Sequence, residues 1–148
     1  MADVSEDTQP AARWRVPPAQ TAVKAVAAAA LTALALASLD DPQFVLLAGV
    51  AAVGAAVLAA RDVLAPVRLE ADADGLTAVR GYARRERLAW QRVVAVRVDE
   101  RRRLFSRTML LEIETADDLV MLSRFDLGAD VRDVAETLTA LRDRATTP

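Results

Sequence analysis

Two apolar runs separated by only four residues constrain the fold of this chain more than any other feature. Residues 25–39 (AVAAAALTALALASL) and 44–60 (FVLLAGVAAVGAAVLAA) contain no charged side chain, and DDPQ lies between them. A bilayer core about 30 Å thick requires roughly 20 helical residues, and each run reaches that length when its flanks are counted. Neither run has the polar face of a helix in a soluble bundle. We therefore predict a transmembrane helical hairpin over residues 20–61.

A cleaved signal peptide is the alternative interpretation of the first run. Residues 35–38 (ALAS) have the small-x-small form that a signal peptidase prefers. However, a second apolar run follows almost at once. In addition, Asp3, Glu6 and Asp7 occupy the region in which a signal peptide is basic. Both observations favour the hairpin.

The charges that flank the hairpin predict its orientation. Five basic residues lie just outside or at the margin of the two runs, and the connecting turn is acidic. The basic residues are Arg13, Arg15, Lys24, Arg61 and Arg68, and the turn contains Asp40 and Asp41. Because basic flanks stay on the cytoplasmic side, we expect an inner-membrane protein with two spanning helices and with both termini in the cytoplasm.

Alanines recur at every fourth position in both runs. They are Ala25, Ala29, Ala33 and Ala37 in the first, and Ala48, Ala52, Ala56 and Ala60 in the second. Small-residue stripes let helix backbones approach closely, so they predict helix–helix contact, including contact between copies of the chain in a homo-oligomer. A general bias towards alanine explains the stripes equally well.

Composition excludes several functional classes. The chain has 148 residues, without cysteine or histidine, which removes thiol nucleophiles, disulfides, the commonest zinc and haem ligands and the usual general base near neutral pH. It has no glycine-rich phosphate loop and no nucleophile paired with a base. We expect no enzyme activity, no cofactor and no metal. The sequence pI of about 5.2 is far below that of nucleic-acid-binding domains, so we expect no nucleic-acid partner.

After Pro66 the pattern changes to short strands, in which apolar and polar residues alternate. Residues 67–72, 76–82, 87–90, 94–98, 109–114 and 119–125 are predicted strands, joined by turns that include DADG and TADD. A last helix is expected from Asp130, because Val131, Val134, Leu138 and Leu141 share one face. The expected organisation is a disordered tail (1–19), the hairpin (20–61) and one domain (66–146), whose core contains Trp90, Val96, Leu111 and Leu138.

Two membrane helices followed by this domain resemble the bacterial pleckstrin-homology-like (PH-like) proteins grouped as the low molecular weight protein antigen 6 family. The resemblance is carried by VRLEADADGLTAVRG, LAWQRVVAVRV, MLLEIET, LVMLSRF and VRDVAETLTALRDR. It implies an α+β chain, in which a two-helix transmembrane hairpin precedes a PH-like antiparallel β-barrel of six or seven strands capped by a C-terminal helix. It supplies no catalytic residue.

In phosphoinositide-binding eukaryotic relatives, basic residues around the first hairpin turn hold the phosphates. The first turn predicted here is DADG, with Asp72 and Asp74, which would repel phosphate. Inositide recognition in that familiar mode is therefore not expected.

Arginines are concentrated in one part of the domain. Residues 80–107 hold ten arginines against three acidic residues, whereas residues 108–148 hold four arginines against nine acids. Alternate turns of a meander share one end of a sheet, so GYARR and DERRRLFSR should lie together at the membrane end, and DADG and TADD at the other. The candidate contact residues are Arg84, Arg85, Arg101, Arg102, Arg103, Leu104, Phe105 and Arg107.

Two functions fit these observations. The first is a membrane-anchored module for protein docking or assembly at the cytoplasmic face of the membrane, with a protein partner. The second is sensing of anionic lipid headgroups by the arginine-rich turns. A solvated charged loop is the structural alternative for the arginines.

Overall fold

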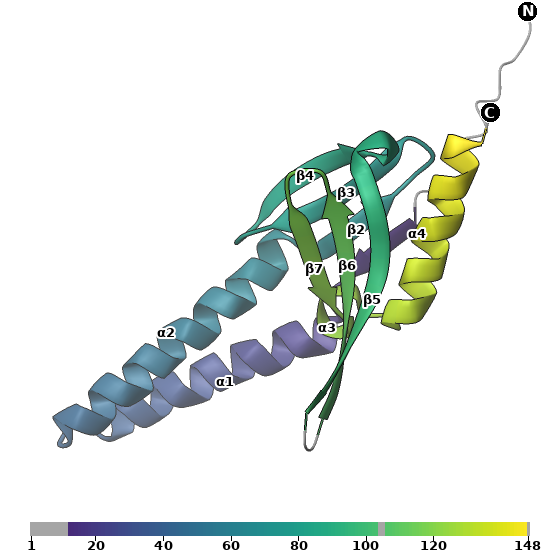
Figure 1. Cartoon of the computed structure of the whole chain (residues 1–148). Coiled ribbons are helices and arrows are strands. Elements are labelled where there is room, and N and C mark those ends of the chain that lie inside the picture. Colours follow the sequence, from purple (N-terminus) through teal and green to yellow (C-terminus); the bar gives the residue numbers. More distant parts are fainter. Residues whose placement is uncertain (1–11, 104–105, 148) are drawn as a thin grey trace, which may run out of the picture. The chain divides into compact units, whose positions relative to one another are not determined.

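The structure is a computed structural model that describes residues 12–103 and 106–147. The chain forms two compact units. One is residues 16–66, which we call the helical hairpin. The other combines the segment that ends at Arg15 with the chain from Val67 onward, and we call it the β-domain. Figure 1 shows the two helices of the first unit and the strands of the second.

The helical hairpin consists of α1 (Pro18–Ala37) and α2 (Pro42–Leu64). Asp41 caps α2, and its carboxylate accepts hydrogen bonds from the backbone N–H groups of Gln43 and Phe44, both at 3.1 Å. Proline at the first helical position suits this start. The helices have 20 and 23 residues and mean hydropathies of 1.5 and 2.2, and at about 1.5 Å per residue each reaches roughly 30 Å. Both are long and apolar enough to cross a membrane.

The two helices pack through small residues, but only partly through the predicted stripes. Ala48 and Ala52 are buried, as is Ala35. The remaining stripe residues are exposed, namely Ala25, Ala29, Ala33, Ala37, Ala56 and Ala60. A strict four-residue spacing drifts by about 40° per step around a helix of 3.6 residues per turn. A straight stripe therefore leaves the contact face after one or two steps.

The β-domain contains two antiparallel sheets that do not form a closed barrel. The four-stranded sheet has the order β1–β2–β3–β4 and the three-stranded sheet the order β5–β6–β7. The strands are β1 (Ala12–Arg15), β2 (Val67–Ala71), β3 (Gly75–Arg80), β4 (Arg84–Ala89), β5 (Val93–Arg103), β6 (Ser106–Thr115) and β7 (Leu119–Ser123). A 3-10 turn, η1 (Trp90–Arg92), joins the sheets, and α3 (Arg124–Leu127) and α4 (Val131–Thr146) follow β7.

Strand β1 corrects the prediction that residues 1–19 form a disordered tail. It pairs with β2, with Trp14 opposite Leu69, and Trp14 packs against the core. Residues 1–11 lie outside the described chain. In sequence order, the helical hairpin is thus an insertion between two hydrogen-bonded neighbours of one sheet. The DADG turn joins β2 to β3, so it is the second connection of the sheet, and the helical hairpin is the first. The comparison of DADG with the first hairpin turn of phosphoinositide-binding relatives was therefore made with the wrong turn.

Strands β5 and β6 extend into the stretch that was predicted to be a turn. Arg101 pairs with Thr108 and Arg102 with Arg107, whereas β7 pairs with β6 only from Leu110 onward. Residues 100–103 and 106–109 therefore form a two-stranded arm that continues beyond β7, visible in Figure 1 as the long β5–β6 ribbon. We call it the β5–β6 arm.

The core lies between the sheets and α4. Trp90, Leu111 and Leu138 are at most 1% exposed, which confirms three of the four predicted core positions, and Val96 is half-buried against the same cluster. The predicted cap of the last helix is confirmed, because Asp130 Oδ1 accepts a hydrogen bond of 2.8 Å from the Arg132 N–H.

Replacing Leu138 by alanine tests whether α4 closes the core. The side chain is fully buried, so Leu138→Ala should lower the free energy of unfolding by about 2–5 kcal/mol. The measurement is thermal and denaturant unfolding of the detergent-solubilised chain. Glu136→Ala, which changes an exposed residue of the same helix, should have little effect. An unchanged melting temperature for Leu138→Ala would mean that α4 does not close the core.

Candidate binding surface

The acidic turns form ion pairs with arginines of the four-stranded sheet and η1. Asp72, in the turn between β2 and β3, accepts two hydrogen bonds from the Arg87 guanidinium, at 2.8 and 2.9 Å. In the turn between β6 and β7, Asp117 Oδ2 lies 3.7 Å from Arg92 Nη2, and Asp118 accepts from Arg80. Asp72, Asp117 and Asp118 are therefore each paired with an arginine within the domain.

These contacts correct the predicted polarity of the domain. Asp118 belongs to the TADD turn, and Arg80 ends the strand that leads into GYARR, yet their side chains meet. The rule that alternate turns share an end holds within one sheet. Here the chain passes to a second sheet at η1, so the rule does not extend across that point.

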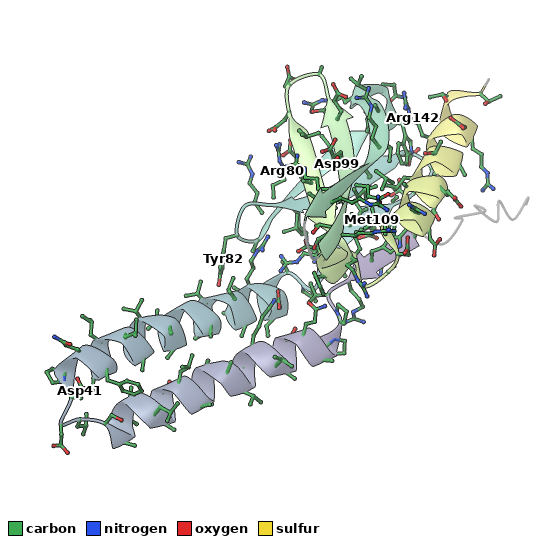
Figure 2. The ribbon with its side chains drawn as sticks, turned by 60° about the horizontal axis from the view of Figure 1, so that its bottom comes forward. Asp41, Arg80, Tyr82, Asp99, Met109 and Arg142 are labelled. Carbon is green, nitrogen blue, oxygen red and sulfur yellow. The ribbon has the colours of Figure 1, made fainter. Side chains whose placement is uncertain are left out.

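A shallow hollow lies at the turn between β3 and β4. Its lining residues are Arg80, Gly81, Tyr82, Ala83, Arg84 and Glu86, of which Figure 2 labels Arg80 and Tyr82. Arg80 Nη1 donates to Glu86 Oε2 at 2.7 Å, and this bond is the main reason that the pKa of Glu86 lies below its usual value. Arg80 is thus already neutralised. Arg84, which is opposite Arg80 in the β3–β4 register, makes no ion pair with any described residue.

The acids nearest the β5–β6 arm are also engaged. Asp99 accepts a 2.7 Å hydrogen bond from Arg101 Nε, and Glu100 accepts from Arg132 of α4 at 3.3 Å. Arg102 and Arg107 face each other across the arm, both exposed, and neither has an acidic partner among the described residues. Like charges directly opposite each other destabilise a strand pair, so this pair has an electrostatic cost.

The predicted contact residues separate into three groups. Arg84, Arg85, Arg102 and Arg107 are exposed and make no ion pair within the described chain. Arg101 is bound to Asp99. The side chain of Arg103, and Leu104 and Phe105 altogether, lie outside the described part. The exposed arginines occupy two separate hairpin ends, not one pocket, and their contact with lipid or partner stays a prediction.

Sequence reasoning missed three exposed apolar side chains, Leu119 and Met121 on β7 and Phe125 on the short helix α3 that follows it; we refer to these three residues as the apolar patch. Their exposed fractions are 43%, 52% and 61%. Leu119 and Met121 share the outer face of the three-stranded sheet with their cross-strand neighbours Glu114 and Glu112. The signal was present in the sequence, because LVML places apolar residues on both faces of β7 whereas a half-buried strand alternates with polar residues.

The free edge of β7 is protected against strand addition at both ends. The Leu119 N–H donates to Asp118 Oδ1 at 2.7 Å, and the Ser123 N–H donates to Asp126 Oδ2 at 3.1 Å. Side chains that satisfy edge donors oppose pairing with another chain. A partner of the apolar patch would therefore bind its side chains rather than extend the sheet.

The Asp72–Arg87 pair predicts a pH dependence of stability. The hydrogen bond from Arg87 is the largest cause that lowers the pKa of Asp72 below its usual value. The contribution of the pair to the free energy of unfolding is therefore complete above the pKa of Asp72 in the unfolded chain. It is lost as the pH falls through the lower pKa of Asp72 in the folded chain. Because Arg87 is half exposed, it amounts to no more than about 1 kcal/mol.

Asp72→Asn should accordingly unfold with a weaker pH dependence than the wild type between pH 6 and pH 2, an interval that spans about two units either side of the usual carboxylate pKa. Asp74→Asn, in the same turn, serves as the matched control, and its pH dependence should follow the wild type. Equal slopes for wild type and Asp72→Asn would show that the pair contributes nothing.

Comparison with known proteins agrees with this architecture. A family model described as "Bacterial PH domain" matches residues 66–144. Two mycobacterial proteins, uncharacterized protein Rv0010c of Mycobacterium tuberculosis (strain ATCC 25618 / H37Rv) and uncharacterized protein MT0013 of strain CDC 1551 / Oshkosh, are each 43% identical over 102 residues, which cover 68% of this chain and 71% of the relative. No solved structure matches the chain significantly. The described residues contain no group of three or more acidic side chains placed to hold a metal ion.

Proposed function

Because this chain belongs to the bacterial PH domain family, we propose that it is a membrane-anchored PH-like module for protein docking or assembly at the cytoplasmic face of the cell membrane. The observation that carries the proposal is the position of the helical hairpin in the chain, between the paired strands β1 and β2. The module therefore keeps its sheet intact only if both ends of the hairpin return to the same place.

The surface of the hairpin supports membrane insertion. Large apolar side chains along α2 are exposed in the isolated chain, among them Leu46 at 69%, Leu47 at 71% and Val50 at 65%. In the most apolar 18-residue segment of each helix, the buried share is 0% for α1 and 11% for α2. Helices satisfy their own backbone hydrogen bonds, so lipid can cover such side chains without cost to the backbone.

One buried ion pair is compatible with insertion of the hairpin in a membrane. Lys24 Nζ lies 2.5 Å from Asp62 Oδ2, and the Asp62 side chain is only 3% exposed. The second apolar run ends at Ala60, but α2 continues to Leu64 and therefore includes Asp62. Both residues lie near the helix ends that lead to β1 and β2, where a paired charge is cheapest in a membrane.

A topology assay tests the anchor. Reporters fused after Pro148 should be active in the cytoplasm and inactive outside it, because five basic residues flank the helices and Asp40 and Asp41 lie in the connecting turn. A reporter inserted in that turn should behave in the opposite way. Activity of the C-terminal fusion outside the cell would overturn the proposed orientation, and a chain released from membranes by alkaline washing would overturn insertion.

The apolar patch of Leu119, Met121 and Phe125 is our candidate for the protein-docking surface. Docking surfaces combine an apolar centre with a polar rim, and here Glu112 and Glu114 are the cross-strand neighbours. A partner surface with apolar side chains and basic residues would complement it.

Site-specific photo-crosslinking tests this surface. A photoreactive residue placed at Met121 should give a discrete crosslinked product in cells, and the same residue at Thr137, exposed on α4, should not. Replacing the neighbouring Leu119 by lysine should reduce the Met121 product at least about tenfold, as expected for an interface side chain worth more than about 1.4 kcal/mol. A product that is unaffected by Leu119→Lys would place docking elsewhere.

A further inference from the structure

We propose that Arg84, Arg85, Arg102 and Arg107 contact the phosphate groups of anionic phospholipids in the membrane that holds the hairpin. This inference rests on the proposed membrane anchor. It concerns a different surface from the apolar patch. It also selects, from the described arginine side chains of residues 80–107, those that have no acidic partner among the described residues.

The ion pairs within the domain separate the arginines that have an acidic partner from those that have none. Arg80, Arg87, Arg92, Arg97 and Arg101 each have an acidic partner. Arg84, Arg85, Arg102 and Arg107 have none among the described residues. The acids at the base of the arm, Asp99 and Glu100, are held by Arg101 and Arg132, so they are not available to neutralise Arg102 and Arg107.

The Arg102–Arg107 pair is itself suited to an anion. The two side chains share one face of the arm, and their mutual repulsion would be relieved by a negative group placed between them. A guanidinium donates paired hydrogen bonds to phosphate oxygens in a planar geometry. A lipid phosphodiester offers such oxygens with a single negative charge.

The fold places one of these arginine clusters at the end of the sheet that leads to the hairpin. The register Leu69↔Ala78 brings the start of β2 beside the end of β3, and Arg84 and Arg85 begin β4 directly after the next turn. Only two residues separate β1 from α1 and α2 from β2, a reach of about 7 Å at 3.3–3.6 Å per residue. With the hairpin inserted, this end of the sheet is held close to the bilayer surface.

A lipid surface fits this arrangement better than a protein does. The four arginines occupy two separate hairpin ends, whereas a protein interface has one continuous apolar core. Attraction to an anionic bilayer acts on each basic residue near the surface nearly independently. It therefore does not require the arginines to converge on one pocket.

The test uses the full chain in lipid nanodiscs of phosphatidylcholine alone or mixed with phosphatidylglycerol. The chain contains no cysteine, so a single cysteine at Thr108, exposed on the arm, can carry a fluorophore. A lipid with a nitroxide on its headgroup quenches the fluorophore when the arm is at the surface. A second chain labelled at Ala116, exposed in the β6–β7 turn, reports on a turn whose acids are paired.

Quenching at Thr108 should be strong in the anionic discs, weak in the neutral discs and abolished near 1 M salt, where the Debye length is about 3 Å. Each arginine changes the ratio of docked to undocked arm about fivefold. Arg102→Glu with Arg107→Glu should therefore lower this ratio about 30-fold or more. Arg84→Glu with Arg85→Glu should lower it as well.

The matched control is Arg142→Glu with Arg144→Glu. It makes the same change of charge at two arginines of α4 that have no ion pair in the described chain, and it should leave quenching unchanged.

Quenching of the wild-type chain that does not depend on lipid charge or on salt would overturn the inference, and this outcome needs no variant. Arm reversals that keep the wild-type melting temperature and full quenching would also overturn it, and would leave the arginines to an acidic protein. Failure of the chain to co-elute with discs would instead refute the anchor.

Discussion

The pairing of β1 with β2 is the constraint on which the remainder of the structure depends. These two strands are neighbours in one sheet, although residues 16–66 lie between them in the chain. Adjacent strands are about 4.8 Å apart, so the inserted segment must return close to the point at which it left. An antiparallel pair of helices meets this requirement, and the Val16 N–H continues it by donating to the Pro66 carbonyl at 2.9 Å.

The Lys24–Asp62 pair serves the same requirement inside the hairpin. A buried ion pair adds little to stability in comparison with apolar packing, but removal of one partner leaves a costly buried charge. Helices made largely of alanine, leucine and valine can slide or rotate against each other with small changes in packing. One ion pair near the helix ends therefore favours a single register, and that register is the one that brings the ends back to β1 and β2.

Features set by local pattern could be predicted from the sequence, and features set by distant partners could not. The apolar runs and the spacing of Val131, Val134 and Leu138 are local, so both long helices and α4 were predicted. Strand β1 has four residues and a partner more than fifty positions away, and nothing in its own sequence signals that pairing. In the β5–β6 arm, residues 100–102 and 107–108 are exposed, so this part of the two strands lacks the apolar alternation by which strands are predicted.

The candidate arginines were predicted as a cluster, but only the ion pairs separate those that are engaged from those that are not. The chain from residue 66 onward holds fifteen arginines and fifteen acids, and a segment of zero net charge has a weak field at long range. Attraction of its unpaired arginines to an anionic surface acts only within about one Debye length, roughly 8 Å in physiological salt. Such contact therefore depends on an anchor that already holds the domain at the bilayer, which makes the hairpin a precondition of the lipid contact rather than a second, independent means of membrane binding.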